Sequence, residues 1–177
     1  MKKQPAPALC DKEPSRVPHE NTPLNEARPF PDIGMKGRVP RILLAEDDPA
    51  IRDVLGLMLT WMNYDLDFAE DGLKAVELWE KGGYDLVLMD VQMPRLDGFA
   101  ATRAIRKKEG ERGGHTPIVA MTAHARKEDE ERCLAAGMDC HISKPIDFEK
   151  SLQVIGNIFA QMSGGMATFT SLPSEGT

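Results

Sequence analysis

Three short, unbroken apolar runs mark the middle of the chain, at residues 42–45 (ILLA), 86–89 (LVLM) and 118–121 (IVAM). Runs of this length and composition are typical of parallel strands that are covered on both faces. Two weaker segments, residues 64–69 and 139–144, fit a second and a fifth strand, and we expect the fifth to lie nearer an edge of the sheet. The hydrophobic pattern therefore predicts five strands.

Helical periodicity fills the intervals between these strands. Asp48 followed by Pro49 is an N-cap and first-turn signal, and the apolar residues that follow fall on one helical face. The predicted helices cover about residues 49–62, 71–81, 98–108, 127–136 and 147–159. Strands that alternate with helices in this way indicate an α/β fold of (βα)₅ type, with an open parallel sheet and helices on both of its faces.

Both ends of the chain differ from this periodic middle. Eight of the 13 prolines lie in residues 1–40, and Phe30 is the only aromatic residue there. Such a segment cannot bury enough apolar surface to offset its ordering entropy. We therefore expect a linker or tail at residues 1–39, a folded domain at residues 40–162 and a second short tail at residues 163–177.

Composition narrows the class of protein. The 177-residue chain has a formal net charge of -6 and three cysteines. Its apolar runs are shorter than the roughly 18 residues that cross a bilayer, and Pro5 and Pro7 interrupt the N-terminus, so we expect neither membrane insertion nor a signal peptide. An odd number of cysteines without metal-ligand spacing favours a reducing cytoplasm. A net acidic chain without a basic cluster gives no electrostatic reason for direct binding to nucleic acid.

Polar residues end or follow four of the predicted strands. Glu46 and Asp47 come after the first, Asp90 ends the third, Thr122 ends the fourth and Lys144 ends the fifth. Right-handed crossovers place the carboxyl ends of parallel strands at one edge of the sheet, where ligands of such folds bind. Taken singly, each residue is explained well enough as part of a helix start, a strand end or a solvated surface. Their joint placement predicts a site at this edge.

The acidic residues at this edge need a neutralising partner. Two carboxylates about 4 Å apart repel by roughly 4 kcal/mol at an effective dielectric constant near 20. Mg²⁺ accepts one or two carboxylates, a backbone carbonyl and water, and it shares its shell with substrate phosphates. With a lysine and a hydroxyl nearby, the site suits a phosphoryl group, and Asp90 is a candidate nucleophile because carboxylates form aspartyl phosphates.

Four segments of the chain carry a family resemblance: ILLAEDDPAIRDVL, DLVLMDVQMPRLDGFAATRAIR, TPIVAMTAHA and AAGMDCHISKPID. They resemble the receiver domain of two-component response regulators, and their sequences are most similar to those of receivers attached to hybrid sensor histidine kinases. The resemblance covers about residues 40–160, with 43, 32 and 22 positions between consecutive members of the series Asp47, Asp90, Thr122 and Lys144. It implies a flavodoxin-like (βα)₅ fold with the parallel strand order 2-1-3-4-5.

The resemblance also implies a reaction. Asp90 would accept a phosphoryl group from a phosphohistidine on a histidine kinase or a histidine phosphotransfer protein. Asp47 would bind Mg²⁺ directly together with Asp90, with Mn²⁺ as the alternative ion. Glu46 would act through a coordinated water, and Gln92 would offer its backbone carbonyl. The protein would then switch or relay a two-component signal through protein contacts, with self-phosphorylation and autodephosphorylation as its own reactions rather than enzymatic turnover of another substrate.

Further residues take roles from the resemblance. Thr122 would hydrogen-bond a phosphoryl oxygen, Lys144 would pair with the phosphoryl group, and Pro145 matches a proline that is usually preceded by a cis peptide. His141 stands where many receivers have Tyr or Phe, so we expect it either to form part of the switch face with Thr122 or to be a partly exposed strand residue. His124 lies where the family tunes the lifetime of the phosphoryl group.

Three other functions compete with this interpretation. A phosphohydrolase of the haloacid dehalogenase type also uses a strand-end aspartyl nucleophile with Mg²⁺, but it needs a second Asp where this chain has Gln92. A dinucleotide-binding domain is disfavoured because AEDDPA replaces the glycine-rich turn, and its acids would repel a pyrophosphate. A non-phosphorylated pseudo-receiver that only binds partners stays open, although the side chains expected of a phosphoacceptor are present.

The remaining features receive structural interpretations. Cys133 and Cys140 are predicted to pack as small apolar groups, and Trp61 and Trp79 to pack on helices rather than stack against a ligand. The charged run at residues 126–132 is typical of a solvated helix face. Only a short polar segment follows the last predicted helix, so we expect a protein that acts by protein contact or relay, either alone or as part of a hybrid kinase.

Overall fold

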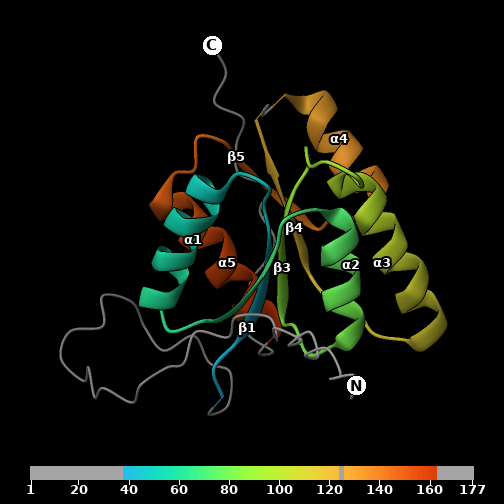
Figure 1. The fold of residues 1–177 in the computed structure, drawn as a ribbon, viewed down its shortest axis with the longest axis horizontal. Helices are drawn as coiled ribbons and strands as arrows, with labels where there is room; N and C mark the ends of the chain where they lie inside the picture. The colour runs from blue at the N-terminus through green and yellow to red at the C-terminus, as the bar shows by residue number, and fades with distance from the viewer. Residues whose placement is uncertain (1–37, 124–125, 163–177) are drawn as a thin grey trace, which may run out of the picture. The chain divides into compact units, whose positions relative to one another are not determined.

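The computed structural model describes residues 38–123 and 126–162, in which strands and helices alternate (Figure 1). The strands are β1 (Arg41–Ala45), β2 (Asp65–Ala69), β3 (Leu86–Asp90), β4 (Ile118–Thr122) and β5 (Cys140–Ser143). The helices are α1 (Pro49–Trp61), α2 (Gly72–Lys81), α3 (Gly98–Arg112), α4 (Lys127–Ala136) and α5 (Phe148–Met162). The predicted (βα)₅ alternation is confirmed, although α3 runs past its expected end at residue 108. The predicted tails lie outside the described residues, apart from Arg38 and Val39.

The strands form one parallel sheet in the order β2-β1-β3-β4-β5, which confirms the expected order. Side chains alternate across β1: Ile42 and Leu44 pack in the cluster that contains α1 and α5, whereas Leu43 and Ala45 pack in the cluster that contains α2, α3 and α4. Figure 1 shows α1 and α5 on one side of the sheet and α2 and α3 on the other. Burial on both faces explains the unbroken apolar runs of the central strands.

Both of the weaker predicted strands form edges of the sheet, as the expected strand order requires. The edge strand β2 carries Asp65 and Asp67, which face Arg41 of β1. Arg41 Nη2 lies 2.5 Å from Asp67 Oδ2, and its Nε lies 3.9 Å from Asp65 Oδ2. Charged side chains on an edge strand discourage pairing with another chain, so β2 has fewer apolar residues than the central strands.

Aspartates begin several of the helices by accepting hydrogen bonds from backbone amides of the first turn, at 2.7–3.1 Å. They are Asp48, Asp71, Asp97 and Asp147. The N-cap role predicted for Asp48 is therefore confirmed. Since α1 and α3 begin a few residues beyond β1 and β3, the N-termini of both helices lie at the carboxyl edge of the sheet. This edge is the one at which the sequence predicted a site.

One packing prediction is wrong and others are confirmed. Trp61 at the end of α1 is 65% exposed, and it continues a line of exposed apolar residues through Val54 and Leu57. Trp79 packs partly buried, and its indole Nε1 donates to Thr116 Oγ1 at 3.1 Å. Cys133 is buried as predicted, and burial raises the pKa of its thiol. In the residues that the structure describes, we find no helix with the length and apolar character needed to span a membrane.

Candidate functional site

The carboxyl ends of β1 and β3 bring two acidic side chains into the protein interior. The two strands are neighbours, with Ala45 opposite Met89, so Glu46 and Asp90 follow at the same level of the sheet. Glu46 is 1% exposed and Asp90 is 4% exposed. The backbone N–H of Glu46 also donates to the carbonyl of Ala69 at 3.0 Å, which fixes its place beside β2. Two carboxylates buried side by side are unfavourable unless a cation or a proton is close.

Lys144 supplies a cation to this pair from the loop after β5. Its Nζ lies 2.8 Å from Asp90 Oδ2 and 2.8 Å from Glu46 Oε2. Its backbone N–H donates to the carbonyl of Thr122 at 2.6 Å, so the end of β4 positions the lysine backbone. Burial disfavours the charged ammonium, but hydrogen bonds to Asp90 and Glu46 outweigh that effect and raise the pKa of Lys144. Burial also raises the pKa of Glu46, although the hydrogen bond from Lys144 opposes that shift.

Asp47 adds a third carboxylate to this group, which we call the acidic cluster: Glu46, Asp47 and Asp90. One oxygen of each residue lies within 4.8 Å of those of the other two. Asp47 is exposed, so the cluster opens to solvent on one side. Among residues 38–123 and 126–162, Lys144 is the one cation that forms ion pairs with these carboxylates. Clustered carboxylates that exceed their cations can hold a hard metal ion.

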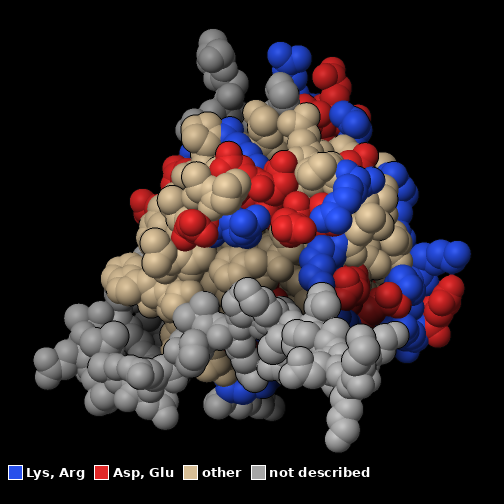
Figure 2. Space-filling view, in the orientation of Figure 1, with Lys and Arg blue, Asp and Glu red and all other residues tan. Residues whose placement is uncertain are grey.

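The molecular face drawn in Figure 2 is of mixed charge. Asp and Glu side chains gather in the centre of this face, and Lys and Arg side chains lie around them. A concentration of one charge sign raises the local concentration of the opposite ions. The acidic centre of this face therefore favours the approach of cations.

The loop between β3 and α3 folds tightly against the end of β3. The backbone N–H of Gln92 donates to Asp90 Oδ1 at 3.1 Å, so one carboxylate oxygen of Asp90 contacts a backbone amide and the other contacts Lys144. The N–H of Gly98 donates to the carbonyl of Val91 at 3.0 Å. A Cβ atom on Gly98 would lie 2.1 Å from the carbonyl oxygen of Asp90, so a larger residue there would push the loop away from the strand. Glycine is thus required for this close approach.

The other predicted site residues lie at different distances from the cluster. Thr122 is buried at the end of β4, joined to Lys144 through the backbone contact described above. The peptide between Lys144 and Pro145 is cis, as the resemblance implied. His141 is half-buried within β5 rather than at its carboxyl end. His124 lies outside the described residues. The structure therefore brings Lys144 and the acidic cluster together, with Thr122 adjacent.

One contributor to the site was missed in the sequence. Arg52, in the first turn of α1, donates from Nη1 to the backbone carbonyl of Glu46 at 3.0 Å. This bond holds the turn between β1 and α1 that carries Asp47 and Asp48. Helical periodicity could not reveal it, because the two residues stand on opposite sides of a strand-to-helix turn. Gly98 was part of a recognised segment, but its contact with Asp90 depends on the path of the loop.

Comparison with known proteins gives family-level matches. The family model described as a response regulator receiver domain matches residues 42–156. A hybrid signal transduction histidine kinase of Dictyostelium discoideum is 40% identical over 120 residues, and the match covers 65% of this chain and 7% of that protein. The sensor protein GacS of Pseudomonas syringae pv. syringae is 42% identical over 127 residues, covering 70% of this chain and 14% of that protein. The chain therefore spans a small part of these relatives' length.

Solved structures with the same fold include two informative neighbours. The receiver domain of a sensor histidine kinase from Pseudomonas aeruginosa, solved with a magnesium ion coordinated in its active-site cleft, is 37% identical with a TM-score of 0.62, and the match covers 72% of this chain and 99% of that one. The receiver domain of Ssk1 from Saccharomyces cerevisiae, solved with the histidine phosphotransfer protein Ypd1, is 27% identical with a TM-score of 0.68, covering 74% and 94%. Both neighbours support the fold class predicted from the sequence.

Proposed function

Because the chain belongs to the response regulator receiver domain family, we propose that Asp90 accepts a phosphoryl group from a phosphohistidine on a partner protein in a Mg²⁺-dependent reaction. This family consists of signalling domains of two-component systems rather than classical enzymes. The observation that carries the proposal is the acidic cluster at the carboxyl edge, in which three carboxylates face a single lysine within the described part of the chain. A phosphoryl acceptor with this surplus of negative charge needs a cation before an anionic donor can approach.

The donor set at the cluster fits Mg²⁺. Hard oxygen ligands at an edge open to water suit an ion that keeps part of its hydration shell. Asp47 and Asp90 would bind it directly, Gln92 would add its backbone carbonyl, and Glu46 would act through a coordinated water; Mn²⁺ could take the same place. Bound there, the ion would neutralise the carboxylates and polarise the phosphoryl oxygens. The Pseudomonas aeruginosa neighbour, which holds magnesium in its cleft, supports this assignment.

The transfer itself would use side chains already in place. A carboxylate oxygen of Asp90 would form a bond to phosphorus while the bond between phosphorus and the partner's imidazole nitrogen breaks, and the electron pair of that bond would leave with the imidazole. Lys144 now pairs with Asp90 Oδ2 at 2.8 Å, so a small movement of its flexible stem would bring the ammonium to a phosphoryl oxygen. Thr122 would place its hydroxyl on another phosphoryl oxygen.

The partners and the surroundings of the domain form part of the proposal. We assign the donor to a histidine kinase or a histidine phosphotransfer protein, because the relatives are histidine kinases and the Ssk1 receiver was solved with such a phosphotransfer protein. Direct nucleic acid binding and membrane insertion form no part of this function. Residues 40–162 would be the receiver unit, and residues 1–39 and 163–177 would connect it to other domains or act as tails, in the cytoplasm. Thr122 and His141 would belong to the switch that reports phosphorylation.

Mass spectrometry after incubation with acetyl phosphate and Mg²⁺ tests the proposal directly. We expect one base-labile phosphoryl group on the wild-type protein and none on Asp90→Asn. The matched control is Asp53→Asn, which makes the same exchange at an exposed position of α1 and should be labelled like the wild type. Excess EDTA should suppress labelling of both competent proteins.

Four outcomes would count against the assignment. An unlabelled wild type would favour a receiver that only binds partners, and equal labelling of Asp90→Asn would place the acceptor elsewhere. Rapid multiple turnover of a generic phosphomonoester would instead indicate a hydrolase of the aspartyl-phosphate type. Loss of label from Asp53→Asn as well would show that the assay reports folding rather than chemistry.

A further inference from the structure

The loop between β3 and α3 is attached to α2 as well as to β3. The N–H of Gly72, the first residue of α2, donates to the carbonyl of Leu96 at 3.1 Å. A Cβ atom on Gly72 would lie 2.2 Å from that same oxygen, so the loop passes as close to α2 as a glycine permits. This contact lies in the same loop as Gln92, whose carbonyl is the proposed metal ligand. The N-terminus of α2 therefore helps to fix the path of the loop that carries the proposed metal ligand.

Arg95, in the middle of this loop, has an unusual backbone conformation. Its φ is 63°, in the left-handed region that non-glycine residues other than Asn and Asp rarely adopt. Such a conformation is strained, and it persists where the surrounding contacts hold it in place. The side chain of Arg95 supplies a reason: its Nη2 forms an ion pair with Asp71 and lies 3.1 Å from Glu70 Oε1.

Asp71 is committed to this arrangement on both of its oxygens. It is fully buried, with 0% exposure, although it carries a charge. Its Oδ1 accepts the N-cap hydrogen bond from the N–H of Lys74 at 2.8 Å, and its Oδ2 faces Arg95. A buried carboxylate is retained at such a place only if it is paired. Asp71 thus links the start of α2 to the loop that follows Asp90.

We infer that Asp71 and Arg95 are positioning residues for the metal site: their ion pair holds the β3–α3 loop so that Asp90 and the carbonyl of Gln92 face a common ion. The inference rests on the proposed function. Neither residue would touch the metal ion or the phosphoryl group. The pair acts by reducing the conformations of the loop, and so lowers the entropy lost when the ion binds. Loss of the pair should weaken Mg²⁺ binding.

The signs of the expected effects separate this role from simple electrostatics. Arg95 is a cation, so removing its charge would strengthen Mg²⁺ binding if only long-range charge mattered. Asp71 is an anion, and removing its charge would weaken binding for the same reason. A positioning role predicts that both changes weaken binding, and that the second change adds little once the first has broken the pair.

Matched variants make this test. Arg95→Asn removes the guanidinium but keeps a residue that tolerates positive φ, and Asp71→Asn removes the charge but keeps a good N-cap. Arg95→Lys retains the charge and should rescue in part. Glu77→Gln breaks exposed ion pairs elsewhere on α2 and is the control. The measurements are calorimetric Mg²⁺ titration and the Mg²⁺ dependence of labelling by acetyl phosphate.

We expect each Asn variant to raise the Kd for Mg²⁺ about tenfold, the usual loss when a residue supporting a metal ligand is changed. The labelling rate at saturating Mg²⁺ should stay near that of the wild type, whereas the melting temperature of Arg95→Asn in EDTA should fall, because the variant leaves the buried carboxylate of Asp71 without its cation. Glu77→Gln should match the wild type throughout.

Different results would overturn the proposed function and the positioning role. A wild-type protein that neither binds Mg²⁺ nor takes up phosphate would overturn the proposed function. A competent wild type with an unchanged or lower Kd in Arg95→Asn would overturn the positioning role alone. An additive double variant would do the same, since it would show that the residues act independently.

Discussion

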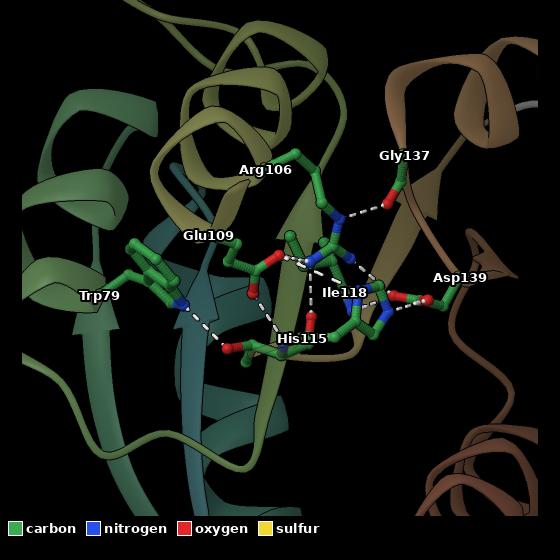
Figure 3. Close-up of polar contacts among 8 residues, drawn as sticks. Trp79, Arg106, Glu109, His115, Ile118, Gly137 and Asp139 are labelled. Carbon is green, nitrogen blue, oxygen red and sulfur yellow. Dashed lines mark hydrogen bonds and ion pairs between the residues drawn. The ribbon is translucent and has the colours of Figure 1, made fainter. Parts of the chain in front are cut away.

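The two edges of the sheet both carry buried acidic side chains, and they differ in how those side chains are neutralised. At the amino edge, Arg106 of α3 lies between Glu109 and Asp139, with Nη2 2.7 Å from Asp139 Oδ2 and Nη1 2.5 Å from Glu109 Oε2 (Figure 3). Backbone amides complete the group: the N–H of Thr116 donates to Glu109 Oε1 at 2.6 Å, and that of Ile118 donates to Asp139 Oδ2 at 2.7 Å.

Two further contacts saturate this amino-edge network. Arg106 Nε donates to the carbonyl of Gly137 at 2.7 Å, which ties α3 to the end of α4. His115 Nε2 lies 2.6 Å from Asp139 Oδ1, so both oxygens of that carboxylate have polar neighbours. The planar guanidinium meets several acceptors at fixed angles, as this side chain does in stable ion pairs. The network joins α3, β4 and the turn before β5.

The carboxyl edge also combines carboxylates with a cation, but it has more carboxylates for each cation. There the flexible ammonium of Lys144 serves both Glu46 and Asp90, and Asp47 is added at the solvent side. The comparison shows that buried acidic side chains do not by themselves identify a functional site. Carboxylates with a full set of donors stabilise the fold, whereas carboxylates that share one lysine at an edge open to solvent can still bind a ligand that supplies positive charge.

Removing the cation at the amino edge should have the largest effect on stability. Arg106→Met leaves Glu109 and Asp139 without their guanidinium, and we expect the free energy of unfolding to fall by about 3–5 kcal/mol, as for other broken buried pairs. Urea denaturation with and without Mg²⁺ measures it. The loss should be equal in both conditions; recovery in Mg²⁺ would contradict the assignment of this network to architecture.

Removing the cation at the carboxyl edge should cost less and depend on metal. Lys144→Met leaves the acidic cluster without its ammonium, and we expect a loss of about 2 kcal/mol in EDTA, because one open side lets water relieve part of the repulsion. Mg²⁺ should restore most of the loss, since the variant offers the ion more negative charge. Equal losses with and without Mg²⁺ would mean that the two edges respond alike.

Removing an acid at the carboxyl edge should stabilise the fold in the absence of metal. Asp90→Asn lowers the repulsion with Glu46 while Lys144 keeps one carboxylate partner, so we expect a gain of about 1 kcal/mol in EDTA. Mg²⁺ should then add less stability than it adds to the wild type. A destabilised variant, measured by the same urea titration, would show that the cluster is fully compensated as it stands.

The exposed ion pair between Lys108 and Glu80 should have the smallest effect on stability. Hydrogen bonding from Lys108, supported by the charge of Arg112, lowers the pKa of Glu80 below its ordinary value of 4.5. A lowered pKa contributes stability above pH 4.5, and this contribution is lost as the pH falls through the lowered value. Glu80→Gln should therefore reduce the melting temperature slightly at pH 7 and not below the lowered pKa. A large effect, or one that survives high salt, would contradict surface screening.

The elements that depend on local pattern were predictable from the sequence. The apolar runs of β1, β3 and β4 appeared directly, because strands buried on both faces contain few polar residues. Asp48 was recognisable as a cap because capping uses short-range hydrogen bonds. The resemblance then singled out Asp90, Lys144 and the cis bond before Pro145.

The errors share a physical origin in neighbours that a sequence window does not contain. Trp61 was expected to pack on a helix rather than stack against a ligand, yet it falls on the same helical line as the exposed Leu57. The end of α3 was placed too early, at residue 108, and the last turn beyond it carries charged residues. In the structure one of those residues, Glu109, is buried by its contacts with Arg106.

By itself, the sequence determined which chemical groups reach the carboxyl edge, because chain connectivity brings the ends of parallel strands to one side of the sheet. It also determined their order and the fold class. Only the tertiary structure decided which charges form ion pairs. Lys144 contacts Glu46, 98 positions away in the sequence, and Arg95 in the β3–α3 loop contacts Asp71 at the start of α2. Coulomb energies depend on distance and burial rather than on sequence separation, so the division between a saturated network and an open site arises only when the sheet is assembled.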